Sequence, residues 1–179
     1  KMIGKAPAIL AAVLCLAAPA RADVVTAEPG GFQVKNTLTI AAPPAKVYAA
    51  LLKPAQWWSS EHTWSGNAAN LRLSAKAGGC FCEKLEGGGS VQHMTVIYAA
   101  PGQELRLNGA LGPLQTEAAT GVLVITLAAK DAGTELVQTY TVGGWTKGGW
   151  TAWAPDVDAV LSEQFGRLKT YAETGKPPQ

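Results

Sequence analysis

The strongest constraint on the fold is a run of alternating apolar and polar residues, broken by glycine turns, between Leu71 and Val142. Side chains of a strand point alternately to its two faces, so this alternation predicts strands with one buried face. Turns such as Gly78-Gly79 and Asp131-Ala132-Gly133 are short, and short turns join antiparallel neighbours. With the similar segment 32–40, the pattern predicts a seven-stranded antiparallel sheet over 32–40, 71–76, 80–85, 91–99, 104–108, about 115–129 and 135–142.

Two short helices and one long helix are predicted around this sheet. Pro44 suits the first position of a short helix, Pro54 ends it, and a second helical turn follows from about Ala55. Residues 155–174 are the long helix, because apolar side chains recur there at helical spacing and Gly175 follows. A sheet with one apolar face and one long amphipathic helix predicts an α+β domain in which the helix covers the sheet.

The first 22 residues have the pattern of a signal peptide. Lys1 and Lys5 precede the apolar run Ala8–Ala18, and Ala20-Arg21-Ala22 has the small residues of a cleavage site. The apolar run is shorter than the about 20 residues that a permanent membrane span needs. We therefore expect export to the periplasm or secretion, followed by release without a stable membrane anchor.

Removal of this segment changes the charge of the protein. It takes away three of the 15 basic residues and none of the 13 acidic ones, so the formal net charge falls from +2 to −1. A nearly neutral domain without a Lys/Arg cluster is not typical of nucleic-acid-binding proteins. We expect a flexible N-terminal segment at 23–31, one domain at 32–175 and a short tail at 176–179.

His62, His93 and Glu83 are the candidate acid/base residues. The two histidines are the only side chains that titrate near neutral pH without a perturbed pKa. His93 either points into the interior or makes a structural hydrogen bond, and His62 is either a loop residue bonded to backbone or a ligand contact. Glu83 shares a strand face with Phe81; if that face is internal, burial should raise the pKa of Glu83, and the alternative is an outward face or an ion pair.

Cys80 and Cys82 are two apart on one predicted strand, with Cα atoms about 6.8 Å apart if the strand is ideal. That separation is at the limit of disulfide geometry, so we expect free thiols or a weak, easily reduced bond. The cysteines should face away from Glu83, and the spacings typical of zinc sites are missing, so no metal and no cofactor is predicted.

The chain resembles the START-like (SRPBCC) superfamily, most closely its polyketide cyclase/dehydratase-type and heat-shock ATPase-activator-like members. The resemblance covers about residues 33–173 and rests on the order of elements, the closing helix and three local strings. These strings are AAPPAKVY at 41–48, Trp57-Trp58, and GGCFCE at 78–83. The resemblance implies a helix-grip fold, in which a curved antiparallel sheet wraps the C-terminal helix around a cavity for apolar molecules.

Three functions are consistent with this resemblance. The leading hypothesis is an exported domain that binds a small hydrophobic ligand such as a lipid or polyketide. The alternatives are a cyclase/dehydratase-type enzyme that uses His62, His93 and Glu83 as acid/base groups, and a protein-interaction module of the activator-like type. The expected ligand-binding residues are Trp57, Trp58, His62, Trp64, Phe81, Glu83, His93, Trp150 and Trp153.

The six tryptophans form two clusters, Trp57/Trp58/Trp64 and Trp145/Trp150/Trp153. Large rings are ordinary core residues, but rings in glycine-flanked loops also suit the mouth of an apolar pocket. In a helix-grip fold the first cluster precedes the second strand and the other follows the last strand. We therefore expect both clusters at one end of the domain, around the cavity entrance.

We predict that the exported protein begins at Asp23, because cleavage is expected after Ala22. N-terminal sequencing of protein recovered from the periplasm or medium measures this directly. Exported protein that retains residues 1–22 would contradict the prediction.

Overall fold

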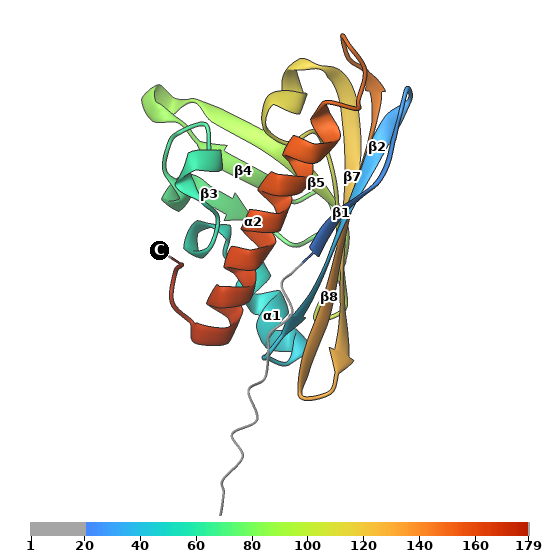
Figure 1. The fold of residues 1–179 in the computed structure, drawn as a ribbon. Helices are drawn as coiled ribbons and strands as arrows, with labels where there is room; N and C mark the ends of the chain where they lie inside the picture. The colour runs from blue at the N-terminus through green and yellow to red at the C-terminus, as the bar shows by residue number, and fades with distance from the viewer. Residues whose placement is uncertain (1–20, 179) are drawn as a thin grey trace, which may run out of the picture.

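The computed structural model describes residues 21–178, which form one antiparallel sheet and a long helix, α2 (Trp153–Thr174), that lies across it (Figure 1). The eight strands follow the order β1-β2-β8-β7-β6-β5-β4-β3. The predicted α+β class and helix-grip arrangement are thus confirmed. Within the described part of the chain, no helix combines the length and apolar character needed to cross a membrane.

The sheet has one strand more than the sequence predicted. The strands are β1 (Arg21–Glu28), β2 (Gly31–Ile40), β3 (Leu71–Leu73), β4 (Cys80–Lys84), β5 (Ser90–Ala100), β6 (Glu104–Asn108), β7 (Ala118–Lys130) and β8 (Gly133–Trp145). The additional strand is β1, which pairs with β2 through residues expected to be flexible. Backbone pairing to an open sheet edge leaves little signal in the sequence, and Val24 and Val25 of β1 stay exposed. Most of the predicted signal peptide lies outside the described residues.

The helical segments are short except for α2. They are α1 (Pro44–Leu51) and five 3₁₀ turns, η1 (Pro54–Gln56), η2 (Ser60–His62), η3 (Ala68–Asn70), η4 (Glu86–Gly88) and η5 (Gly112–Thr116). Pro44 starts α1 and Pro54 starts η1, as their fixed backbone angle favours. The segment with the first tryptophan cluster, between η1 and η3, therefore contains only one short turn, η2.

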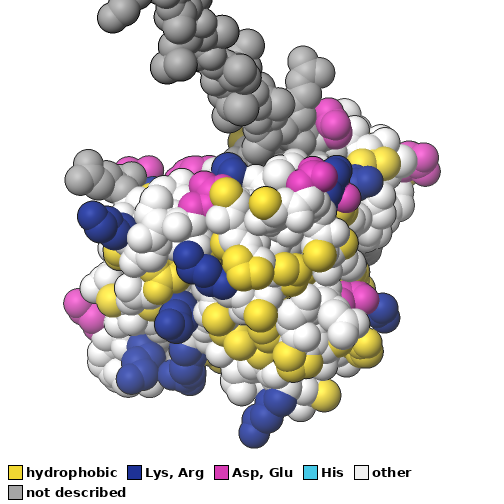
Figure 2. Space-filling view, turned by 90° about the horizontal axis from the view of Figure 1, so that it is seen from below, with side chains coloured by type: hydrophobic (Ala, Val, Ile, Leu, Met, Phe, Trp, Pro, Cys, Tyr) yellow, Lys and Arg dark blue, Asp and Glu magenta, His cyan; other side chains and the backbone are white. Residues whose placement is uncertain are grey.

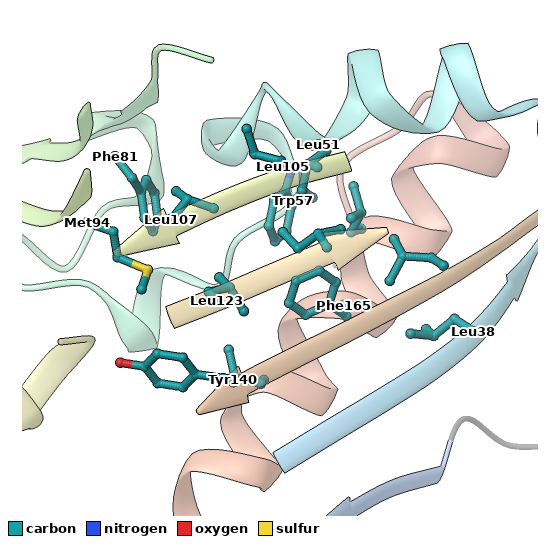
Figure 3. Close-up of a cluster of buried hydrophobic side chains, with 14 of the residues drawn as sticks. Leu38, Leu51, Trp57, Phe81, Met94, Leu105, Leu107, Leu123, Tyr140 and Phe165 are labelled. Carbon is teal, nitrogen blue, oxygen red and sulfur yellow. The ribbon is translucent and has the colours of Figure 1, made fainter. Parts of the chain in front are cut away.

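The core lies between α2 and the concave face of the sheet. Leu161, Phe165 and Leu168 of α2 are almost completely buried, as the helical periodicity predicts. Figure 3 shows part of this core, with Phe165 and Trp57 among leucines of the strands. Each fully buried side chain of this size contributes about 1.5 to 3 kcal/mol to stability. The helix ends at Gly175, whose φ of 72° is readily adopted by glycine.

Cys80 and Cys82 are joined by a disulfide in this structure, and their Cα atoms are 5.4 Å apart. The separation of about 6.8 Å expected from an ideal strand was too long. A disulfide needs Cα atoms about 4.4 to 6.8 Å apart, and β4 is less extended between the two bonded cysteines than an ideal strand.

Docking of α2 can be tested with Leu168→Asp. Leu168 is fully buried, so an aspartate there would bury a carboxylate without a partner and should lower the free energy of unfolding by about 3 to 5 kcal/mol. Urea unfolding measures the change. Ala159→Asp, at an exposed position of the same helix, is the matched control and should cost much less. Equal effects of the two substitutions would show that α2 does not cover the sheet.

Candidate functional site

Residues 57–66, the focal loop, are fastened to α2 by three side chains of that helix. Gln164 accepts a hydrogen bond from the Ser59 N–H at 2.7 Å, and the Nε of Arg167 donates to the Trp57 carbonyl at 2.9 Å. Glu163, the residue just before Gln164, lies 3.1 Å from Nε2 of His62. The loop lacks regular secondary structure apart from η2, so these contacts fix its path over the helix.

The other side of the focal loop is held by Glu83 of β4, whose side chain is completely buried. Its carboxylate accepts hydrogen bonds from the backbone N–H groups of Trp64 at 3.1 Å and Ser65 at 2.5 Å. Nε2 of His93 lies 3.0 Å from the same carboxylate. Glu83 therefore connects the loop to β5 through one fully enclosed charge.

A β-bulge turns His93 towards Glu83. Phe81 pairs with Met94 and Cys82 pairs with Gln92, which leaves His93 as an extra residue on β5. His93 and Met94 are consequently both buried, although neighbouring residues of a regular strand face opposite ways. The imidazole packs on the Phe81 ring with centroids 5.0 Å apart.

Gly109, just after β6, lies directly against this bulge. A Cβ atom at Gly109 would be 2.5 Å from the His93 carbonyl oxygen and 2.9 Å from Cα of Met94. Only glycine allows the two backbone segments to approach this closely. Tyr140 of β8 holds the segment that follows, since its hydroxyl donates to the Gly109 carbonyl and accepts from the Leu111 N–H.

Electrostatics set the protonation of the buried pair. Burial by itself raises the pKa of Glu83, but hydrogen bonds from Ser65, from the Trp64 N–H and from His93 together outweigh it, so the pKa of Glu83 lies below its ordinary value. The predicted rise was wrong because it counted only burial. Burial lowers the pKa of His93 more than Glu83 raises it, so that pKa also lies below its ordinary value. The pair is an ionised carboxylate and a neutral imidazole at neutral pH.

The hydrogen bond fixes the tautomer of His93. An ionised carboxylate only accepts hydrogen bonds, so Nε2 carries the proton and donates it to Glu83. Nδ1 is then the nitrogen with the free lone pair. His93 contributes to the wall of a cavity, and its imidazole is therefore a candidate hydrogen-bond acceptor or base for a molecule bound there.

This cavity has a volume of about 400 Å³, within the usual range of small-molecule sites of about 300 to 1,000 Å³. It lies between the focal loop, the segment around η5 and the first turns of α2. Its wall is mainly apolar, with a few polar groups. The lining residues are Trp58, Glu61, His62, Thr63, Trp64, His93, Leu111, Gly112, Pro113, Leu114, Trp153, Asp156, Val157, Val160 and Leu161.

Members of both tryptophan clusters line this one cavity. Trp58 and Trp64 of the first cluster line it, and so does Trp153 of the second. Trp64 is 50% exposed, whereas Trp58 is half-buried and packs edge-on against Phe81 with centroids 5.5 Å apart. His62 also lines the cavity, so five of the nine expected ligand-binding residues are on its wall.

The remaining expected residues lie elsewhere. Trp57 packs against Phe165 in the core and donates its Nε1–H to the Ala50 carbonyl. Trp150 is buried against Phe32. Phe81 and Glu83 are behind the wall, where they support Trp58 and His93. Trp145 is 68% exposed and outside the cavity lining.

Sequence reasoning missed the contributions of the segment around η5 and of α2. Leu111 and Leu114 lie between the predicted strands 104–108 and about 115–129, and Val157 and Val160 lie in the predicted helix 155–174. None of the four was among the expected ligand-binding residues, although all line the cavity. The carboxylates Glu61 and Asp156 were also missed. The sequence contained one signal for Val157 and Val160, because the apolar face of the closing helix already begins in its first turns.

Metal binding gains no support from this arrangement. Within residues 21–178, no three His, Cys, Asp or Glu side chains gather closely enough to hold a metal ion. Glu83 already accepts three hydrogen bonds, and Cys80 and Cys82 are bonded to each other.

The neutral state of His93 predicts a pH-dependent stability. Its pKa is lower in the folded protein than in the unfolded chain, where it is about 6.5, so the unfolded chain binds a proton first as the pH falls. The stabilisation is complete above about pH 6.5 and is lost below it. Glu83 acts in the same direction only below its own unfolded pKa of about 4.5.

Urea unfolding at several values between about pH 7.5 and about pH 5.5 isolates the contribution of His93. Wild-type stability should fall over this range, and His93→Gln, which keeps an N–H donor for Glu83, should give a flatter profile. Profiles of equal slope would show that His93 is not held neutral by the fold.

Known structures share this fold. An uncharacterized protein from Rhizobium leguminosarum is similar with a TM-score of 0.61 and 18% identity, covering 86% of this chain and 97% of that one. A conserved protein of unknown function, EF2215 from Enterococcus faecalis, is similar with a TM-score of 0.59 and 17% identity, covering 87% of this chain and 78% of that one. CalU16 from Micromonospora echinospora is similar with a TM-score of 0.56 and 13% identity, covering 87% of this chain and 86% of that one. At such identities the likeness shows the fold alone.

The sequence comparisons define the family. No curated protein matches the chain in a sequence search. The family model described as polyketide cyclase / dehydrase and lipid transport matches residues 31–173, which include all strands except β1 and nearly all of α2. This chain therefore belongs to the polyketide cyclase/dehydrase and lipid transport family, within the START-like (SRPBCC) superfamily that its local motifs resemble.

Proposed function

We propose that this protein is an exported domain that binds a small hydrophobic molecule in the cavity between the focal loop, η5 and α2. The observation that carries the proposal is the composition of the cavity wall, which combines three tryptophans with leucines and valines and only a few polar side chains. Such a wall is typical of sites that enclose an apolar body and orient it by a small number of hydrogen bonds.

The exposure of the tryptophans supports an external occupant. Trp64 has half of its surface in water, and Trp153 is only partly buried. A bound molecule would remove this apolar surface from water, with a gain of about 25 cal/mol for each Å² buried. Core packing explains Trp57 and Trp150, but it does not explain indoles on the wall of an open cavity.

Export is part of the proposal and rests on the leader-like pattern at 1–22. A carrier or scavenger of apolar molecules is useful in an aqueous compartment, because such molecules are poorly soluble there. The disulfide between Cys80 and Cys82 is compatible with an oxidising compartment.

Ligand binding can be tested with N-phenyl-1-naphthylamine, an uncharged dye that fluoresces when it enters an apolar site. We expect saturable binding to the wild-type protein. Val157→Trp should weaken this binding at least about tenfold, because the added indole occupies the cavity and contacts worth more than about 1.4 kcal/mol are lost.

Val124→Trp is the matched control for this experiment. Val124 lies on β7 and points to the opposite face from the buried Leu123 and Ile125. The control should bind the dye like the wild type. Dye binding that Val157→Trp leaves intact, or that is absent from the wild type, would refute the proposed cavity function.

Acid/base catalysis in the same cavity is a second candidate function, favoured by the His93–Glu83 pair. Glu83 orients the imidazole and would stabilise the imidazolium that forms when Nδ1 takes a proton. Of the three proposed catalytic residues, Glu83 is the orienting group, because its carboxylate is enclosed by its hydrogen bonds. His62 also lines the cavity, and its Nε2 lies 3.1 Å from the Glu163 carboxylate.

A proton-exchange assay tests this second function. In D₂O, His93 would remove a proton from the carbon next to the carbonyl of 2-tetralone, an apolar ketone, and the resulting enolate would take up deuterium. NMR should show exchange catalysed by the wild type and by His62→Gln, but not by His93→Gln. Exchange that does not depend on His93 would exclude this role.

The third function, a protein-interaction module, has weaker support. It would require a large continuous exposed apolar patch. The large exposed apolar side chains of the described residues are dispersed over four elements: Val24 and Val25 on β1, Trp64 in the focal loop, Ile97 and Tyr98 on β5, and Trp145 on β8.

A further inference from the structure

The charged groups of the cavity wall are all acidic or histidine. Two carboxylates line the cavity, that of Glu61 from η2 in the focal loop and that of Asp156 from α2. Among the described residues, no lysine or arginine lines this cavity. Figure 2 shows the lower end of the molecule, towards which the C-terminal half of α2 runs in Figure 1, and Lys and Arg side chains are present there beside Asp, Glu and apolar side chains.

Three indoles accompany the two carboxylates. Trp58 and Trp64 come from the focal loop, which also supplies Glu61. Trp153 comes from α2, which also supplies Asp156. The face of an indole ring attracts cations through its quadrupole, and tryptophan does so more strongly than other aromatic residues. Indoles and carboxylates on one wall are typical of sites for ammonium groups.

Each carboxylate has a simpler explanation when considered alone. Asp156 is in the first turn of α2, where a negative charge interacts favourably with the helix dipole. Glu61 is exposed and in the first turn of η2. Neither explanation accounts for three tryptophans on the same wall, nor for the lack of a basic side chain that would bind the carboxylate or phosphate head of an anionic lipid.

We propose that the ligand of this cavity is a hydrophobic cation, with an amine or quaternary ammonium head on an aliphatic or aromatic body, and that anionic amphiphiles bind more weakly. The inference rests on the proposed cavity function and adds the charge of the ligand to it. The apolar body lies against Leu111, Leu114 and Val160, and the head lies near Glu61 and Asp156, where both carboxylates remain in contact with water.

Three probes with ten-carbon chains separate charge from apolar contact: decyltrimethylammonium and decanoate below their micelle concentrations, and decanol below its solubility limit. Calorimetry and tryptophan fluorescence measure their binding at neutral pH and low salt. The ammonium probe should bind at least about tenfold more tightly than decanoate, with decanol between them, since exposed ion pairs and cation–π contacts are each modest. The preference should shrink as salt is added.

The double variant Glu61→Gln/Asp156→Asn should bind decanol like the wild type but lose most of the preference for the ammonium probe. Asp131→Asn/Glu135→Gln changes the net charge equally at the β7–β8 turn, outside the cavity lining, and is the matched control. Asn tolerates the positive φ of 51° at position 131. The control should keep the full preference.

The outcomes distinguish this inference from the proposed function. If none of the three probes binds, the cavity function itself fails. If decanol binds but decanoate binds as tightly as the ammonium probe, the cavity function stands and the inference about charge is wrong. A preference for the ammonium probe that persists in Glu61→Gln/Asp156→Asn would also overturn it, because the two carboxylates would then not be its source.

Discussion

The candidate site depends on one enclosed charge, the carboxylate of Glu83. It binds the backbone of the focal loop through Trp64 and Ser65, and it binds β5 through His93. Burying a carboxylate is costly unless hydrogen bonds replace its hydration, and here three of them do so. The loop that carries Trp58 and Trp64 to the cavity is thereby held against the sheet on one side, while Gln164 and Arg167 hold it against α2 on the other.

The same contacts decide what each polar residue is able to do. Glu83 is stabilised as an anion, so it orients His93 rather than donating a proton itself. His93 is kept neutral by burial, and Nδ1 of this cavity-lining residue has a free lone pair. The bulge that places His93 there also requires glycine at position 109 on the next strand connection. The contacts that hold the focal loop in place therefore also orient the imidazole that is the candidate base.

Much of the fold could be predicted from the sequence, because its signals are local. Alternation along β2, β7 and β8 and the apolar face of α2 each arise within a single segment, and glycine turns indicate which strands are neighbours. The strand β1 was missed because it adds to the sheet edge by backbone pairing, and its exposed valines do not show a buried face. The separation of Cys80 and Cys82 was overestimated because an ideal strand was assumed, whereas β4 is less extended between the two bonded cysteines.

The sequence by itself determined the α+β class, the antiparallel sheet, the covering helix, and His62, His93, Glu83 and the tryptophans as candidates. The tertiary structure decided which candidates meet. It placed Trp58, Trp64 and Trp153 on the cavity wall and Trp57 and Trp150 in the core, and it added Glu61 and Asp156. It also reversed the expected pKa shift of Glu83. The physical reason is that periodicity fixes only the face of an element, whereas contacts between residues far apart in the chain depend on register, bulges and loop paths.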